Sequence, residues 1–110
     1  MPRPTVDLLQ GTLDLLILEV LDAGPLHGWA ISHRIRERSK DALQVNQGSL
    51  YPALHRLEED GVLRSEWARS ETQRRVKMYR LTKPGERRLH AERAAWRRYI
   101  EAVDLIVATG

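Results

Sequence analysis

The most informative segment of this chain reads Gln47-Gly48-Ser49-Leu50-Tyr51-Pro52-Ala53-Leu54-His55-Arg56-Leu57-Glu58-Glu59-Asp60-Gly61. Its leucines recur at spacings of four and three residues, which is the pattern of an amphipathic helix that packs one face against a core. Gly61 provides the residue type that commonly ends a helix, and Pro52 is tolerated near a helix N-terminus. The segment therefore predicts a helix of about three turns.

The first turn and the non-core face of this predicted helix carry groups suited to contact with DNA. Small and hydrogen-bonding residues in the first turn let a bulky polyanion approach the positive end of the helix dipole. Positions beside the leucine stripe point away from the core. The alternatives are a buried Tyr51 and merely solvated side chains at His55 and Arg56. The candidate DNA-binding residues of this helix are Gln47, Gly48, Ser49, Tyr51, His55 and Arg56.

Beyond Gly61 the helical period gives way to alternation, which predicts two strands at residues 62–69 and 74–82 joined by a polar tip. From Arg64 to Arg88 nine basic residues stand against three acidic ones, a local balance of +6, whereas the whole chain carries +3. Grouped like charges repel one another and destabilise a fold unless a bound anion neutralises them. The alternative interpretation is a basic face that is merely solvated. We therefore expect phosphate contacts from Arg74, Arg75 and Lys77.

Two helices are predicted before the central segment, from about Asp7 to Asp22 and from about His27 to Ser39, separated by Gly24-Pro25. Apolar residues of the first helix cover more than the one stripe that a surface helix needs. In so small a domain, the second apolar side is expected to contact another subunit. The interface residues predicted there are Leu9, Leu13, Leu16 and Ile17.

A last helix is predicted from about Glu86 to Val107, after a break at Lys83-Pro84-Gly85. Its apolar residues fall on a seam spaced close to a heptad, which Arg93 interrupts. At 1.5 Å per residue such a helix would extend roughly 30 Å, beyond the small domain that it leaves. It therefore needs a partner surface, and the predicted dimer-interface residues are Trp96, Ile100, Val103 and Val107.

The expected fold is mostly α with a two-stranded β-hairpin, in the order of three helices, hairpin and long helix. That order is typical of a winged helix-turn-helix, in which the third helix enters the major groove and the basic hairpin, or wing, follows the backbone or minor groove. We expect a DNA-binding domain at residues 1–82 and a C-terminal dimerisation helix at residues 83–110.

Four motifs resemble the PadR family of bacterial transcriptional regulators: Leu9-Gln10-Gly11-Thr12-Leu13, Gly24-Pro25-Leu26-His27-Gly28-Trp29, the block from Gln47 to Glu58, and Tyr79-Arg80-Leu81-Thr82. The resemblance implies a winged-helix repressor that dimerises through its first and last helices and binds a roughly palindromic operator. It also implies that Gly48, Ser49 and Tyr51 lie at the DNA surface and that the basic wing contacts phosphates. The single C-terminal helix resembles the smaller subfamily. Trp29 departs from the family, in which tyrosine is common at this position.

Trp96 is a candidate effector contact as well as an interface residue. Plain packing is the simpler interpretation, because large aromatic side chains dominate many interfaces. Some proteins of the resembling family bind flat apolar molecules between subunits, so a small planar apolar effector is the alternative.

Several functional classes find no support in the sequence. The chain has no cysteine, and its four histidines are scattered without metal-site spacing, so neither a metal nor a cofactor is expected. No catalytic motif is present, which argues against an enzyme. The longest apolar run, Leu15 to Leu18, is far too short to cross a bilayer, and no signal peptide is recognised, so a cytoplasmic protein is expected. The rival function is a winged-helix protein-interaction module that does not bind DNA.

Overall fold

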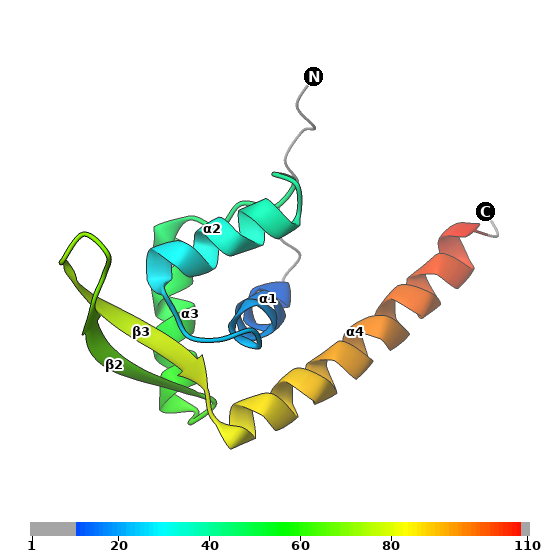
Figure 1. Cartoon of the computed structure of the whole chain (residues 1–110). Helices are drawn as coiled ribbons and strands as arrows, with labels where there is room; N and C mark the ends of the chain where they lie inside the picture. Colours follow the sequence, from blue (N-terminus) through cyan, green and yellow to red (C-terminus); the bar gives the residue numbers. More distant parts are fainter. Residues whose placement is uncertain (1–10, 109–110) are drawn as a thin grey trace.

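The computed structural model describes residues 11–108 and confirms the mostly helical winged-helix architecture (Figure 1). A three-stranded antiparallel sheet stands beside the first three helices, and the last helix leaves them at the end of the sheet. The elements are α1 (Thr12–Leu21), β1 (Leu26–His27), α2 (Gly28–Arg38), α3 (Gln47–Glu59), β2 (Leu63–Arg69), β3 (Arg75–Leu81) and α4 (Lys83–Ala108).

The core is aliphatic and lies between α1, α2, α3 and the base of the sheet. The predicted leucine stripe of α3 is confirmed, since Leu50, Leu54 and Leu57 are completely buried. They pack with residues of α1 and α2, among them Leu18 and Ile31. Each such side chain contributes about 1.5–3 kcal/mol by leaving water, so this cluster holds α3 in place.

Both ends of α3 are set by local residues. The side chain of Asn46 accepts a hydrogen bond from the backbone N–H of Ser49 at 2.8 Å and caps the N-terminus. Gly61 follows the C-terminus with a φ of 77°, in the left-handed region. The expectation for Pro52 needs correction, because it lies inside the helix, five residues after Gln47. Its missing N–H leaves the carbonyl of Gly48 without the usual helical donor.

The sheet has one strand more than the sequence predicted. β2 and β3 form the expected hairpin, in which Trp67 lies opposite Lys77 and Arg69 opposite Arg75. β1 adds two residues to the other side of β3, where Leu26 lies opposite Tyr79. A strand of two residues has no alternation to detect, so the two-stranded prediction was incomplete.

The start of α4 also differs from the prediction, because Lys83, Pro84 and Gly85 form its first turn instead of a break. Proline is compatible with a first turn, where no helical donor is needed. The hydroxyl of Thr82 accepts from the N–H of Gly85 at 3.1 Å and donates to the carbonyl of Gly61 at 2.7 Å. This threonine joins the start of α4 to the end of α3.

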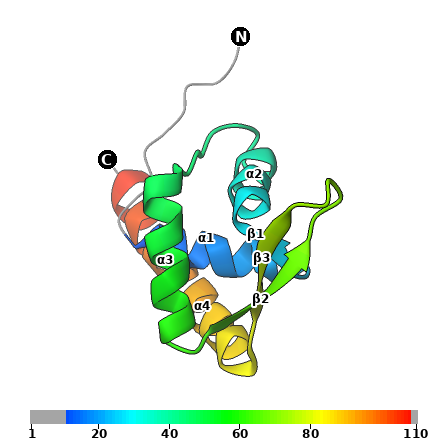
Figure 2. The ribbon, with the colours of Figure 1, turned by 90° about the vertical axis from the view of Figure 1, so that its left-hand side faces the viewer.

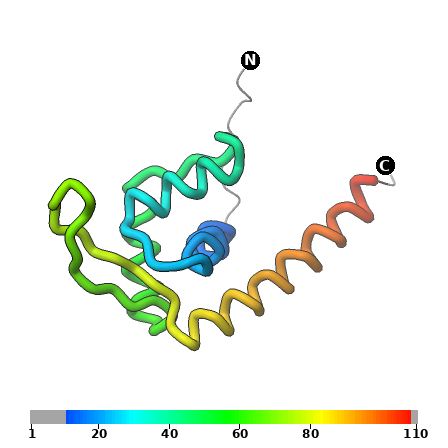
Figure 3. The backbone as a smooth tube through the Cα atoms, in the orientation of Figure 1, coloured from blue at the N-terminus to red at the C-terminus, as the bar shows by residue number. Residues whose placement is uncertain are grey.

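Only the first part of α4 belongs to the core. Leu89 is buried, whereas Leu105, Ile106 and Val107 near the other end are at least 70% exposed. The helix runs away from the body of the domain (Figures 1 and 3). Its 26 residues correspond to about 39 Å, so most of its apolar surface is uncovered within one subunit.

Candidate nucleic-acid interface

The first turn of α3 presents the exposed residues Gln47, Gly48 and Ser49. The Ser49 N–H is already used by the Asn46 cap. The amide nitrogen of Gln47 lies 3.5 Å from the hydroxyl of Ser32, which places Gln47 beside α2. The start of α3 is therefore a small, polar and accessible surface next to α2.

Tyr51 is held against the start of α2 instead of in the core. Its side chain is 47% exposed. A methyl group added at Gly28 would lie 2.6 Å from the Tyr51 hydroxyl oxygen, so the absence of a side chain at Gly28 makes room for the ring. The phenol therefore has one side fixed by α2 and one side open.

His55 and Arg56 point in different directions. His55 is exposed and its Nε2 lies 2.8 Å from a carboxylate oxygen of Glu59. The guanidinium of Arg56 instead forms an ion pair with Asp14 of α1. Of these two expected DNA contacts, only His55 projects from the outer face without a tie to another element; Arg56 connects α3 to α1.

The acidic end of α3 neutralises nearby basic groups. Glu58 accepts from the hydroxyl of Ser65 on β2 and lies 3.7 Å from the ammonium of Lys77 on β3. Asp60 accepts from Arg88 at 3.3 Å. Glu58 thus ties α3 to both long strands of the wing.

The three basic wing residues do not form one free cluster. Arg74 and Arg75 are exposed, and the guanidinium of Arg75 lies over the ring of Trp67, 4.3 Å from its centroid. Lys77 is engaged by Glu58 and lies 5.9 Å from the ring centroid of Tyr79. The arginines near the tip are therefore better placed than Lys77 to contact phosphates.

An open groove separates the wing from α2 and α3, with a volume of about 1040 Å³. Seen from the side, α3 and the hairpin lie on the near face of the molecule (Figure 2). Two exposed tryptophans that sequence reasoning did not include line this groove, Trp29 and Trp67. Trp29 stacks on His33 with 4.8 Å between ring centroids and 9° between planes. Sequence reasoning missed these two residues because their exposure becomes visible only in the fold.

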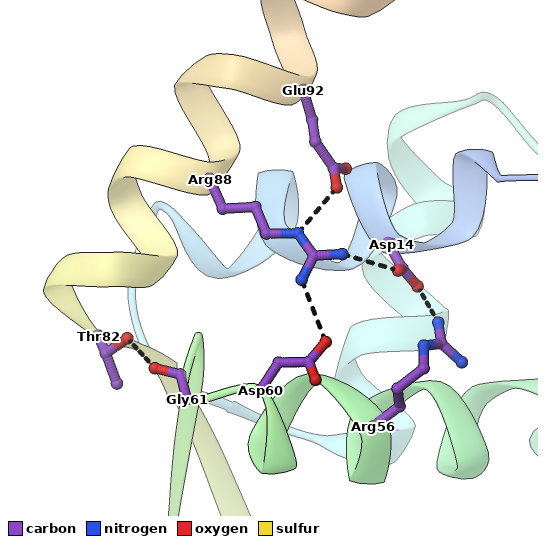
Figure 4. Close-up of polar contacts among 7 residues, drawn as sticks. All are labelled: Asp14, Arg56, Asp60, Gly61, Thr82, Arg88 and Glu92. Carbon is purple, nitrogen blue, oxygen red and sulfur yellow. Dashed lines mark hydrogen bonds and ion pairs between the residues drawn. The ribbon is translucent and has the colours of Figure 1, made fainter.

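A polar network joins α1, α3 and α4 (Figure 4). Arg88 of α4 donates to Asp14 of α1 at 3.4 Å, to Asp60 at 3.3 Å and to Glu92 at 3.0 Å. Asp14 also accepts from Arg56. Burial lowers the pKa of Arg88, but the hydrogen bonds to Glu92 and Asp60 outweigh that effect and raise it. The guanidinium therefore stays charged at the meeting point of three helices.

A second ion pair fastens α4 to α1. Arg93 donates twice to Glu19, both at 2.7 Å, and once to Asp22 at 3.2 Å. The hydrogen bond from Arg93 lowers the pKa of Glu19, against the opposing effect of burial. The sequence predicted only that Arg93 interrupts an apolar seam, whereas in the structure Arg93 faces α1.

The predicted dimer-interface residues differ in the surface that they offer. Ile17 is completely buried inside this chain and therefore offers no exposed surface to a partner. Leu9 lies outside the described residues. Leu13 and Leu16 are half-buried beside the core. On α4, Trp96, Ile100 and Val103 are half-buried and Val107 is 70% exposed.

Trp96 lines a small pocket of about 330 Å³ between α1 and α4. The other side chains around it include Leu15, Glu92 and Tyr99. The ring centroids of Trp96 and Tyr99 are 6.0 Å apart. The pocket thus has aromatic walls within a single subunit.

Within residues 11–108, no group of three or more histidine, aspartate or glutamate side chains is placed to hold a metal ion. The helices described there are also too short or too polar to cross a membrane.

Comparison with known proteins agrees with this geometry. The model of the transcriptional regulator PadR-like family matches residues 17–91. A transcriptional regulator of Mycobacterium tuberculosis is 43% identical over 60 residues, 54% of this chain and 55% of that protein. A regulator from Clostridium thermocellum superposes with a TM-score of 0.81 at 28% identity, over 89% of this chain and 92% of that one. A PadR family regulator from Eggerthella lenta gives 0.77 at 31% identity, over 92% and 86%. The chain belongs to the PadR-like family of transcriptional regulators.

Proposed function

We propose that this protein is a homodimeric repressor that binds a roughly palindromic DNA operator. One observation carries the proposal: the exposed Tyr51 of α3 and the exposed Arg74 and Arg75 of the wing line the same open groove. In winged-helix proteins these two elements contact the major groove and the backbone or minor groove. Gln47, Ser49 and Tyr51 would then read bases, while Arg74 and Arg75 contact phosphates.

The proposed dimer uses the outer part of α4 together with α1. The apolar residues near the end of α4 are exposed in one subunit, and such a surface is normally covered by another chain. A two-fold dimer would place two α3 helices on one face of the duplex. Half-sites should therefore lie about one helical turn, roughly 34–36 Å, or a multiple of it, apart.

The proposed effector is a small planar apolar molecule that contacts Trp96. The support is the pocket of about 330 Å³ with Trp96 and Tyr99 in its wall. Quenching of tryptophan fluorescence by a planar aromatic probe should disappear in Trp96→Ala. Dimerisation and thermal unfolding of that variant serve as the controls, because quenching lost with the fold would say nothing about the pocket.

Selection of bound duplexes from a random DNA pool, followed by sequencing, tests the main proposal. The expected result is an inverted repeat, bound by a dimer with salt-dependent affinity. A chain that binds no duplex at low salt would instead be a protein-interaction module. Enrichment of a single half-site by a monomer would contradict the dimer.

A further inference from the structure

The wing carries a cation–aromatic pair whose purpose the proposed function does not explain. Trp67 lies on β2 and Arg75 on β3, and the guanidinium carbon of Arg75 is 4.3 Å from the centroid of the Trp67 ring. Trp67 is opposite Lys77 in the ladder and Arg75 is two residues before Lys77. Residues two apart on a strand share a face, so the two side chains are diagonal neighbours on one face of the hairpin.

Neither side chain is used by the core. Trp67 is 57% exposed and both residues line the groove between the wing and α3. Of the other basic residues that line this groove, Lys77 is engaged by the carboxylate of Glu58 and Arg69 donates to the backbone carbonyl of Gln73. Among residues 11–108, no carboxylate forms an ion pair with Arg75. Its N–H groups therefore remain available to an anion from outside.

Stacking changes what an exposed arginine can do. A guanidinium that lies flat on a ring is attracted by the π face, while its N–H groups point outward in the plane and stay free to donate. An unsupported arginine on a hairpin loses much of its rotamer freedom when it binds a phosphate. A stacked arginine is already partly ordered, so less freedom is lost on binding.

We propose that Trp67 is a positioning residue for DNA binding: its ring holds the guanidinium of Arg75 ready to bind a phosphate of the duplex that enters the groove. This inference rests on the proposed DNA-binding function and adds the residue through which the wing arginine acts. Trp67 need not touch DNA. Its effect on affinity passes through Arg75.

A double-mutant cycle on the full chain separates this role from a general contribution to the wing. Affinity for a labelled random-sequence duplex is measured by fluorescence anisotropy for the wild type, Trp67→Ala, Arg75→Ala and the double variant. Trp67→Ala should weaken binding about two- to fivefold, the strength of an exposed cation–aromatic contact. In the Arg75→Ala background, the same change should have no further effect. An equal loss in both backgrounds would overturn the proposal.

Salt titration provides a second measurement, which distinguishes a tryptophan that positions Arg75 from one that only supports the fold of the wing. Arg75→Ala should lower the slope of log affinity against log salt by about 1, because one phosphate contact is lost. Trp67→Ala removes no charge and should keep the wild-type slope at lower affinity. A slope that falls in Trp67→Ala would mean that the wing itself had collapsed, which contradicts the proposal.

Two further variants serve as controls. Trp67→Phe keeps a ring face and should keep most of the affinity, so a loss as large as that of alanine would count against stacking. Trp29→Ala removes the other exposed tryptophan of the groove, which stacks on His33 instead of Arg75. Its effect should be the same with and without Arg75. If the wild type binds no duplex, the proposed function itself fails; wild-type binding with additive losses removes only the role of Trp67.

Discussion

Arg88 on α4 donates a hydrogen bond of 3.4 Å to Asp14 on α1, although the two residues are 74 positions apart in the chain. Asp14 is only 17% exposed and is shared with Arg56 of α3. The helix α3 and the proposed dimerisation helix α4 are therefore fixed to the same carboxylate. In the proposed dimer, the separation of the two α3 helices would depend on the direction in which α4 leaves each domain. This network therefore connects the proposed subunit contact to the proposed DNA contact.

Arg88→Ala should destabilise the domain more than Arg87→Ala. The Arg88→Ala variant loses hydrogen bonds to three carboxylates, whereas Arg87→Ala removes an exposed side chain. Because Arg88 is one-third exposed, solvent screening reduces the expected loss to about 1–2 kcal/mol. Urea unfolding at low and high salt measures it. Equal losses for the two neighbouring arginines would show that the network contributes little.

Protonation of Glu19 in acid should lower the stability of the folded protein. The hydrogen bond from Arg93 holds the pKa of Glu19 below its ordinary value of 4.5 in the folded protein. Its stabilising contribution is therefore complete above that ordinary value and is lost as the pH falls through the lower folded pKa. Glu19→Gln should be less stable at neutral pH and should lose less stability on acidification. Thermal unfolding between pH 3 and pH 7, the range set by ordinary carboxyl pKa values, tests this, with the exposed Glu101→Gln as control. A wild-type acid dependence left unchanged in Glu19→Gln would refute it.

Gly85→Ala should destabilise the fold strongly. A methyl group at this position would lie 2.1 Å from the carbonyl oxygen of Val62, which is backbone and cannot turn away. Relief requires α4 to move from the end of α3, at a cost of about 1–3 kcal/mol or more. Chemical denaturation of Gly85→Ala and of the exposed neighbour Lys83→Ala gives the comparison. Wild-type stability in Gly85→Ala would mean that the two elements do not pack this closely.

The sequence predicted those parts of the fold that repeat a local pattern. The leucines of α3 repeat at helical spacing and the hairpin alternates, so both elements were found with nearly correct limits. β1 has two residues and no period, which left it invisible. The first turn of α4 was mistaken for a break because proline and glycine were judged without Val62, whose close approach explains Gly85.

The candidate site was predicted less completely than the fold, because pairing between distant residues leaves no local pattern. Arg56 and Lys77 look like free basic residues in the sequence, yet Asp14 and Glu58 engage them across 42 and 19 positions. Trp67 gave no signal, since a tryptophan on an alternating strand is normally expected to pack. Only the ladder register shows that it meets Arg75 outside the core.

The contact between Gly28 and Tyr51 gives a last prediction, which concerns operator binding. A methyl group at Gly28 would lie 2.6 Å from the Tyr51 hydroxyl oxygen, but the phenol is the end of a movable side chain and can turn aside. Gly28→Ala should therefore keep the fold within about 1 kcal/mol, since alanine is also the better helix former, while it moves the ring away from its place beside the groove. If Tyr51 reads bases, Gly28→Ala and Tyr51→Ala should both weaken operator binding more than random-DNA binding. Their combination should be no worse than Tyr51→Ala alone, because the first change acts through the ring that the second removes. Anisotropy titrations of the three variants on both duplexes test this prediction. Additive losses of affinity would mean that Gly28→Ala does not act through Tyr51. Equal losses on operator and random DNA would mean that Tyr51 contacts the DNA backbone and not the bases.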